Sequence, residues 1–436
     1  MKTNTVSKTQ KLHTHEGAVA KRIDAASQLR RSIMSCLLWE KEFYEDGVTI
    51  AERIAFLVPK VSPEIVSTLA IQARSEMNLR HVPLLIAREM ARDPLHKRFV
   101  AKTLAAVIQR PDELAEFVSI YWKDSKKPLS KQVKLGLALA FDKFNEYQFA
   151  KWRGDGNAIK LRDVMFLVHP KPTSAEKETL YKKIADDKLE TPDTWEVALS
   201  SGADKKETWQ RLLAENKLGA LALLRNLRNM EQVGVDKKLV RAAIANMNTE
   251  RILPFRFIAA ARYAPEYEPQ LEAALLKSLA GEKLPGRTIV LIDVSGSMFA
   301  PLSAKSDMER IDAACGVAMV AREICEDVAV YTFSHNTVQV PSRHGFALRD
   351  AIVSSQSHGG TYLGKAIQTI NATEHDRLIV ITDEQSHDTV GDAAESKAYL
   401  VNVASAKNGV GYGKWVHIDG FSEAVIRYIM ELEQDD

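Results

Sequence analysis

The stretch LPGRTIVLIDVSGSM, residues 284–298, decides the fold of the C-terminal part of the chain. After Pro285 and Gly286, the run TIVLID (288–293) is apolar without alternation and ends in a carboxylate. Such a run is typical of a strand that is buried on both faces. The following residues, Val294 to Met298, are rich in Ser and Gly. The stretch therefore predicts a buried strand that runs directly into a polar loop.

Four similar runs follow this strand and are separated by helical patterns such as 308–325. They are DVAVYTF (327–333), RLIVITD (377–383), AYLVNV (398–403) and WVHID (415–419). Continuous apolar strands that alternate with amphipathic helices predict a parallel sheet covered on both faces. We therefore expect an α/β, Rossmann-like domain over residues 286–436. Functional sites in such folds lie at the carboxyl ends of the strands.

Upstream of the Gly/Pro linker at 281–288, residues 21–280 predict an all-α domain. Apolar residues recur there at three- and four-residue spacing, for example over 29–43, 63–76, 82–92, 98–109 and 239–247. Frequent prolines and short connections indicate stacked helix pairs, and the length has room for six or seven HEAT-type units of ~40 residues. Residues 1–20 are polar and are expected to form a flexible arm without a signal core.

The composition is that of a soluble multidomain protein. The chain has 436 residues, of which 45% are hydrophobic and 27% charged, and its net charge is +2. No apolar run approaches the ~18 residues of a membrane span. Three scattered cysteines, Cys36, Cys315 and Cys325, indicate a reducing cytoplasm rather than disulfides or a zinc site. Basic residues crowd positions 123–171, which predicts either an anion-binding surface or an ordinary solvated helix face.

Oxygen-bearing side chains follow two of the predicted strands. Asp293, Ser295 and Ser297 lie at alternate positions after the first strand, and Asp383 ends the strand RLIVIT. Thr361 lies in a Gly-Gly-Thr loop before another helix. Carboxylates and hydroxyls are the ligands of hard cations, so we expect a divalent ion here, Mg²⁺ first and Mn²⁺ or Ca²⁺ as alternatives. The competing interpretation is that Asp293 and the serines merely cap a helix.

This arrangement resembles the metal-ion-dependent adhesion site (MIDAS) of von Willebrand factor A domains, Asp-x-Ser-x-Ser with a distant Thr and a distant Asp. The resemblance implies that Asp293, Ser295 and Ser297 contact or support the metal, that Thr361 adds a hydroxyl, and that Asp383 acts directly or through water. Such sites bind an acidic group of a partner. No nucleotide-binding loop, nucleophile motif or zinc motif occurs. We therefore expect a binding protein and not an enzyme.

The helical part resembles TROVE proteins, the family that includes the Ro autoantigen and its bacterial relatives. The resemblance rests on motifs that extend from THEGA (14–18) to VHIDGFSEAVI (416–426). Between them lie 29–47, KFNEYQFAKWRG (143–154), LRDVMFLVHPKP (161–172), 194–213, LGALALLRNLRNM (218–230) and LPFRFIAAARYAP (253–265). The resemblance implies a helical-repeat ring that binds small structured Y RNA outside and single-stranded RNA 3′ ends inside, with a docked exoribonuclease in bacteria. A monomer is expected.

We place the RNA contacts between 143 and 171. Spacing by four puts Lys143, Tyr147 and Lys151 on one predicted helix face. The resemblance carries RNA binding to Lys151, Arg153 and His169. The full candidate set is Lys143, Lys151, Arg153, Lys160, Arg162, His169 and Lys171.

Each candidate also has an ordinary structural interpretation. Arg162 can pair with Asp163, His169 can end a helix, and Lys151 and Arg153 can be solvated. Further along the chain, Arg225, Arg228, Arg256 and Arg262 are interpreted as bridges between repeats, and Trp39, Trp195 and Trp209 as packing residues.

Three functions remain open at this stage. The first is an RNA-binding scaffold in RNA quality control or processing. The second is a metal-dependent adaptor that binds an acidic protein segment at Asp293. The third, a hydrolase or nuclease, rests only on the presence of a metal site.

Overall fold

The structure is a computed structural model. It describes residues 12–13, 19–20, 24–35, 47–76, 79–154, 158–200, 202–249, 252, 254–279, 283–301, 308–394, 397–403, 409–410, 414–419, 425, 429 and 433. Cys36, Trp39 and most of the expected arm 1–20 lie outside these residues. Within that arm, Leu12–His13 (β1) pairs antiparallel with Val19–Ala20 (β2).

The N-terminal part is helical, as predicted. Its first helices are α1 (Ala25–Ser35), α2 (Gly47–Leu57), η2 (Val58–Lys60), α3 (Pro63–Ser75), α4 (His81–Arg92), α5 (Lys97–Val107), α6 (Asp112–Tyr121), α7 (Lys131–Phe141), α8 (Glu146–Lys151), α9 (Leu161–Val168) and α10 (Ala175–Ala185). The second group is α11 (Trp195–Ser200), α12 (Lys205–Ala214), α13 (Ala220–Gln232), α14 (Lys237–Asn246), α15 (Pro254–Tyr263), η3 (Pro265–Tyr267) and α16 (Glu268–Ser278). The predictions for α3, α4, α5 and α14 are confirmed to within two residues.

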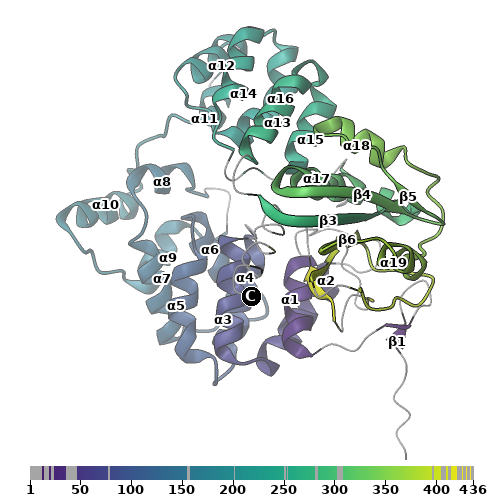
Figure 1. The fold of residues 1–436 in the computed structure, drawn as a ribbon. Helices are drawn as coiled ribbons and strands as arrows, with labels where there is room; N and C mark the ends of the chain where they lie inside the picture. The colour runs from purple at the N-terminus through teal and green to yellow at the C-terminus, as the bar shows by residue number, and fades with distance from the viewer. Residues whose placement is uncertain are drawn as a thin grey trace, which may run out of the picture.

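The two groups of helices belong to different hydrophobic cores. Helices α1–α10 bury apolar side chains from Leu29 to Ile184 in one cluster, in which each helix contacts the next one or two along the chain. Helices α12–α16 instead share a continuous cluster with the sheet and its helix α17. Figure 1 shows this second group lying directly against α17 and α18, apart from α3–α10. The change from helices to strands near residue 284 is therefore not a boundary between cores.

The C-terminal part is a six-stranded sheet in the order β5-β4-β3-β6-β7-β8. Its strands are β3 (Leu284–Asp293), β4 (Cys325–Phe333), β5 (Thr337–Gln339), β6 (Arg377–Thr382), β7 (Lys397–Asn402) and β8 (Val416–Asp419), and its helices are η4 (Gly296–Phe299), α17 (Arg310–Ile324), α18 (Gly345–Val353) and α19 (Leu363–Asn371). All neighbouring strands are parallel except β5, an antiparallel edge strand that the sequence did not predict.

Helices cover both faces of the sheet, which confirms the prediction from the apolar runs. Along β3, Val290 and Ile292 pack with α17, whereas Ile289 and Leu291 pack with Leu363 and other residues of α19. Strands β4 and β6 flank β3 on opposite sides. The chain leaves β3 towards β4 and leaves β6 towards β7, so these two connections diverge at the carboxyl edge of the sheet, which is where a parallel sheet opens a binding site.

The two groups of helices and the sheet contact one another in turn. The end of α8 meets the start of α11 around a cavity, α15 packs on α17, and α1 contacts β8. An ion pair reinforces the second junction, because Arg262 Nη2 of α15 lies 3.0 Å from both carboxylate oxygens of Asp312 in α17. The first helix of the chain thus meets the last strand of the sheet, so the two groups of helices are joined through the α/β part.

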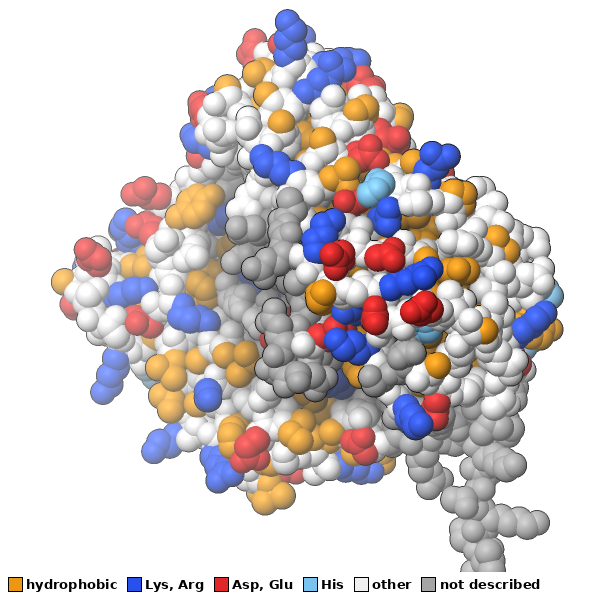
Figure 2. Space-filling model, viewed as in Figure 1, with side chains coloured by type: hydrophobic (Ala, Val, Ile, Leu, Met, Phe, Trp, Pro, Cys, Tyr) orange, Lys and Arg blue, Asp and Glu red, His pale blue; other side chains and the backbone are white. Residues whose placement is uncertain are grey.

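Charges of both signs are mixed on the surface. On the face drawn in Figure 2, Lys and Arg side chains alternate with Asp and Glu, in keeping with the net charge of +2. Within the described part of the chain, no helix is both long enough and apolar enough to cross a membrane.

Candidate metal centre and nucleic-acid interface

Asp293 ends the central strand β3 and is fully buried. Its Oδ1 accepts a hydrogen bond from the backbone N–H of Ser295 at 2.9 Å, and its Oδ2 accepts one from the hydroxyl of Thr382 at 2.6 Å. The carboxylate is therefore held by its own loop and by the end of the neighbouring strand β6. Thr382 was missed in the sequence, although a hydroxyl at the last position of a strand beside Asp383 was a usable signal.

The two serines lie in the turn that follows. Their hydroxyl oxygens are 3.3 Å apart, close enough for both to face one ion. The turn is tied to its surroundings because Val294 N donates to Phe333 O at 3.0 Å and Gly296 N donates to Gly359 O at 3.4 Å. The second bond brings the loop that carries Thr361 to the same edge of the sheet.

Thr361 and Asp383 are both buried at this edge. The backbone N–H of Thr361 lies 3.1 Å from Nδ1 of His387, and its carbonyl accepts the N–H of His387 at 2.8 Å. Asp383 follows β6 directly, and its Oδ1 accepts the N–H of Gln385 at 3.2 Å. All five predicted residues thus lie at one edge of the sheet. The parallel pairing of β3 with β6 brings residues that are far apart in the sequence close together there.

The electrostatics of this edge favour a cation. Burial, together with the negative charge of Asp383, raises the pKa of Asp293 well above its usual range, although hydrogen bonds from Ser295 and Thr382 oppose the shift. A positive ion beside the two carboxylates would relieve this cost. Among the described residues no three His, Cys, Asp or Glu side chains converge on one point, and the candidate donors at this edge are two carboxylates plus hydroxyls. Such a set suits Mg²⁺, which keeps several of its waters.

One prediction about the basic segment is wrong. Lys143 does not share a helix face with Lys151, because α8 begins only at Glu146, where Asn145 and Gln148 form a capping box. Lys143 instead lies in the connection from α7. Its ammonium donates to the carbonyls of Ala105, at 2.5 Å, and Ile108 at the end of α5. It therefore neutralises a helix C-terminus.

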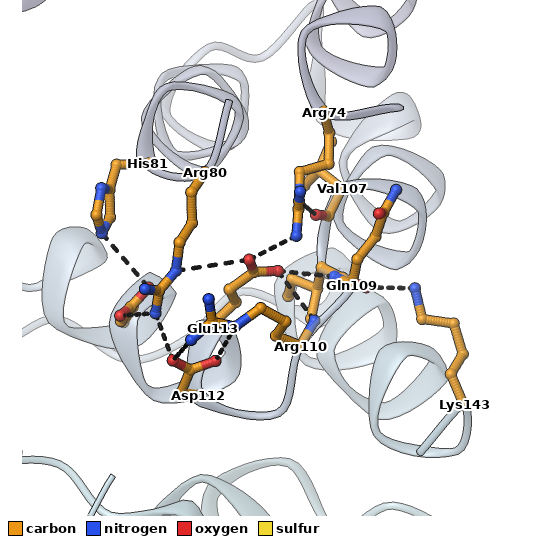
Figure 3. Close-up of polar contacts among 11 residues, drawn as sticks. Arg74, Arg80, His81, Val107, Gln109, Arg110, Asp112, Glu113 and Lys143 are labelled. Atoms are coloured by element: carbon orange, nitrogen blue, oxygen red, sulfur yellow. Dashed lines mark hydrogen bonds and ion pairs between the residues drawn. The ribbon is translucent and has the colours of Figure 1, made fainter. Parts of the chain in front are cut away.

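Figure 3 shows the polar network to which Lys143 belongs. At its centre the carboxylate of Glu113 accepts hydrogen bonds from Arg74, at 2.8 Å, and from the backbone N–H groups of Gln109 and Arg110. Arg80 pairs with Asp112 in the same network. These contacts join consecutive helices, so this group of charges is structural.

The end of α8 brings basic and aromatic side chains together beside a cavity. Tyr147 and Lys151 share a face, with the ammonium 5.8 Å from the ring centroid. The guanidinium of Arg110 covers the Trp152 ring at 3.5 Å. Lys151, Trp152 and Arg153 line a cavity of about 380 Å³ between α8 and the start of α11. Arg153 also forms an ion pair with Asp187. Trp152 and Arg110 were not singled out in the sequence, because only the fold brings them together.

The remaining candidates are exposed around α9. Lys160 precedes α9, and its backbone N–H donates to Asp163 at 2.9 Å, which uses the carboxylate that Arg162 was expected to pair with. His169 ends the helix in the left-handed region, with φ 48° and ψ 61°. Its interpretation as a helix-end histidine is therefore confirmed, and its ring is exposed beside Lys171. A non-glycine residue in this region is strained, and such strain gathers at functional sites.

The interpretation of the other arginines as bridges holds for Arg262 and for Arg228 of α13, whose guanidinium lies 5.9 Å from the centroid of the Tyr263 ring in α15. Arg262 bridges to Asp312. Within the described residues, Arg225, Arg228 and Arg256 form no ion pair, and burial together with the charge of Arg225 lowers the pKa of Arg256. Trp195 and Trp209 stack at 6.0 Å, and Trp209 is 2% exposed, so the packing role of these two residues is confirmed.

Comparisons with known proteins bear on the second helical group and on the fold. The TROVE domain model matches residues 186–285, the segment that contains α11–α16. Telomerase protein component 1 of Mus musculus is 33% identical over 92 residues, which are 20% of this chain and 4% of that protein. The Rattus norvegicus protein of the same name is 21% identical over 314 residues, 52% of this chain and 12% of its own length. The chain thus spans a small part of these relatives.

Among solved structures, the Deinococcus radiodurans RO (RSR) protein is similar over 93% of this chain and 98% of its own, with a TM-score of 0.65 and 17% sequence identity. At this identity the likeness concerns the fold. It covers the helical part and the sheet together, whereas the family model covers α11–α16. Residues 186–285 therefore match the TROVE domain, and the chain as a whole has the fold of the Ro protein.

Proposed function

We propose that the chain is an RNA-binding scaffold, with a contact surface at the corner formed by the end of α8 and by α9. The observation that carries the proposal is the cavity beside Lys151, Trp152 and Arg153. Cations there neutralise phosphates, and the neighbouring ring of Tyr147, which is 51% exposed, offers a surface on which a base stacks. Exposed Lys160, Arg162, His169 and Lys171 extend the surface along α9.

The ligands proposed for this scaffold are small structured non-coding RNAs of the Y type and the single-stranded 3′ ends of misfolded or unprocessed RNAs, in the cytoplasm. The TROVE domain match over residues 186–285 supports an RNA ligand. The mixed surface charge supports a local contact rather than a broad electrostatic footprint. An exoribonuclease is the proposed protein partner, and the protein would act on RNA by binding it.

The test is RNA crosslinking and sequencing in the native cell. It compares the wild type with a Lys151→Ala/Arg153→Ala/His169→Ala variant. Enrichment of one small structured RNA and of assorted 3′ ends, both lost in the variant, supports the scaffold. Equal crosslinking by variant and wild type removes the α8–α9 corner from the proposal, and no crosslinking above background by the wild type removes the RNA function.

A matched control guards against a general charge effect. Lys205 and Lys206 begin α12, are exposed, and lie on the other group of helices. A Lys205→Ala/Lys206→Ala variant loses the same two permanent positive charges as the test variant. It should bind the RNA as the wild type does, and its salt dependence should be unchanged.

A second candidate function rests on the sheet edge. We propose that the α/β part is a von Willebrand factor A-type domain whose Asp293, Ser295, Ser297, Thr361 and Asp383 hold Mg²⁺, and that a carboxylate of a partner protein completes its coordination. The buried Asp293 beside Asp383 supports a bound cation. Mg²⁺ should stabilise the wild type against thermal unfolding, and an Asp293→Ala variant should lose that effect. The two functions use different parts of the chain and are compatible.

A further inference from the structure

The proposed metal site contains a positive charge of its own. Arg310 is the first residue of α17, and its side chain is 2% exposed. Its Nη1 lies 3.5 Å from Oδ2 of Asp383, which is fully buried, and 3.4 Å from the carbonyl oxygen of Ser297. The guanidinium therefore joins two of the three loops that form the site.

The backbone holds Arg310 in this place. Its N–H donates to Ala300 O at 3.1 Å, and Pro301 pairs with Glu309 as an isolated antiparallel bridge. Both ends of the loop between η4 and α17 are thus fixed beside the serine turn. Two residues along, Asp312 faces the other way and pairs with Arg262 of α15. The first turn of α17 therefore places the charge of Arg310 inside the site and the charge of Asp312 against the helical part.

Local physics alone does not favour a cation at this position. A helix N-terminus carries partial positive charge, which disfavours Arg in the first turn, and a buried guanidinium loses its hydration. The negative charge of Asp383 offsets both costs. The contact of 3.5 Å is longer than the roughly 2.7–2.9 Å of a charge-assisted hydrogen bond, so the two groups form a loose ion pair.

We propose that Arg310 is a built-in counter-cation that lowers the divalent-ion affinity of this site and stabilises Asp383 when no ion is bound. The inference rests on the proposed metal site. Two carboxylates and one guanidinium give the site a formal charge of −1 instead of −2. Because the guanidinium repels an entering dication, binding of an ion must weaken the Arg310–Asp383 pair. The site then holds its divalent ion only when the free ion concentration is high enough. A partner's carboxylate can complete the coordination only under that condition.

The first experiment measures the affinity of the purified full chain for Mn²⁺ alone, by titration calorimetry, in Arg310→Gln, Arg310→Lys and wild type. Arg310→Gln should bind Mn²⁺ at least tenfold more tightly, which is about 1.4 kcal/mol. Arg310→Lys keeps the charge and should stay within a few-fold of the wild type. The control is Arg322→Gln at the far end of the same helix, where Arg322 contacts Val328 O and Ser342; it should bind as the wild type does.

The second experiment needs no metal. In the presence of a chelator, Arg310→Gln should unfold at a lower temperature than the wild type, because Asp383 is left buried without its counter-charge. Adding Asp383→Asn should recover a large part of that loss. This double variant also shows whether the single variant fails for a trivial folding reason.

The outcomes separate the inference from the proposed site. If Mn²⁺ binds to the wild type and is lost in Asp293→Ala, but Arg310→Gln binds no more tightly than the wild type, the metal site stands and the role of Arg310 is overturned. If no variant binds Mn²⁺, both are overturned. Tighter binding by Arg310→Gln together with the recovery in the double variant supports both.

Discussion

The hydroxyl of Thr382 donates a 2.6 Å hydrogen bond to Oδ2 of Asp293 and so joins the ends of β6 and β3. The same hydroxyl oxygen accepts the backbone N–H of Glu384 at 3.1 Å. The hydroxyl bond favours the ionised form of Asp293, because it lowers a pKa that burial and Asp383 raise. Thr382 therefore positions the carboxylate that is proposed to hold the cation.

Replacing Thr382 with Val should test this bond, since the shapes match and only the hydroxyl is lost. Asp293 Oδ2 would remain buried without this donor, which should reduce the free energy of unfolding by about 1–3 kcal/mol. Mn²⁺ affinity should fall several-fold, because the carboxylate is less well positioned and harder to ionise. Urea unfolding and calorimetric titration measure the two effects. Thr382→Ser restores the hydroxyl and should restore both; unchanged Mn²⁺ binding in the valine variant would show that Thr382 has no positioning role.

Arg153 should bind RNA more tightly when its partner is removed. Asp187, which has φ 60° and is exposed, pairs with Arg153 beside the cavity at the end of α8. Asp187→Asn removes the competing carboxylate, and Asn tolerates the left-handed backbone. RNA affinity at low salt should rise by a few-fold, as measured by filter binding across a salt series. The neighbouring Asp186→Asn changes the same charge without touching this ion pair. An equal gain in both variants would mean that the gain comes from the change in net charge and not from the release of Arg153.

Substitutions of His169 should separate effects on stability from effects on RNA binding. Its left-handed conformation at the end of α9 costs an ordinary residue about 1 kcal/mol, and glycine avoids that cost. His169→Gly should therefore leave thermal stability equal or higher while RNA binding falls, because the exposed ring is lost. His169→Asn keeps a residue that tolerates this backbone and isolates the contribution of the ring. A glycine variant with full RNA affinity would reduce His169 to a helix terminator.

The sequence predicted those parts of the molecule whose signals are local. The apolar run at 288–293 identified β3, and its end identified the edge where Asp293 lies. The candidate metal residues were singled out because each follows a strand or lies in a glycine loop, and parallel pairing brings such positions together at one sheet edge. In contrast, Lys143 was assigned to the wrong surface, because spacing by four says nothing about the Asn145 cap that starts α8 two residues later.

Other features depend on contacts that no local pattern encodes. Arg110 and Trp152 are far apart in sequence, and only the packing of consecutive helices stacks them. Arg310 reads as an ordinary first-turn residue of an amphipathic helix until the fold turns it towards Asp383. The shared core of α12–α16 with α17 was likewise hidden, because composition changes at the linker whereas packing does not.

The end of the chain should contribute a pH-dependent share of the stability. Although burial opposes it, hydrogen bonds from Arg377 and Lys397 hold the pKa of Glu433 at about 2, and its side chain is 5% exposed. A carboxyl whose folded pKa is depressed stabilises the fold above its unfolded pKa, ~4.5, and loses that contribution as the pH falls towards 2. The shift corresponds to about 3 kcal/mol at neutral pH.

Glu433→Gln should therefore lower the free energy of unfolding by up to about 3 kcal/mol at pH 7, and its difference from the wild type should shrink steadily below pH ~4.5. Urea unfolding at a series of pH values between 7 and 3 gives this difference directly. Glu190→Gln is the control. Glu190 is exposed, and its contact with Lys183 is a long surface pair of 3.7 Å, so this substitution should have a small effect at every pH. A difference for Glu433→Gln that stays constant down to pH 3 would mean that the glutamate acts through packing and not through its charge.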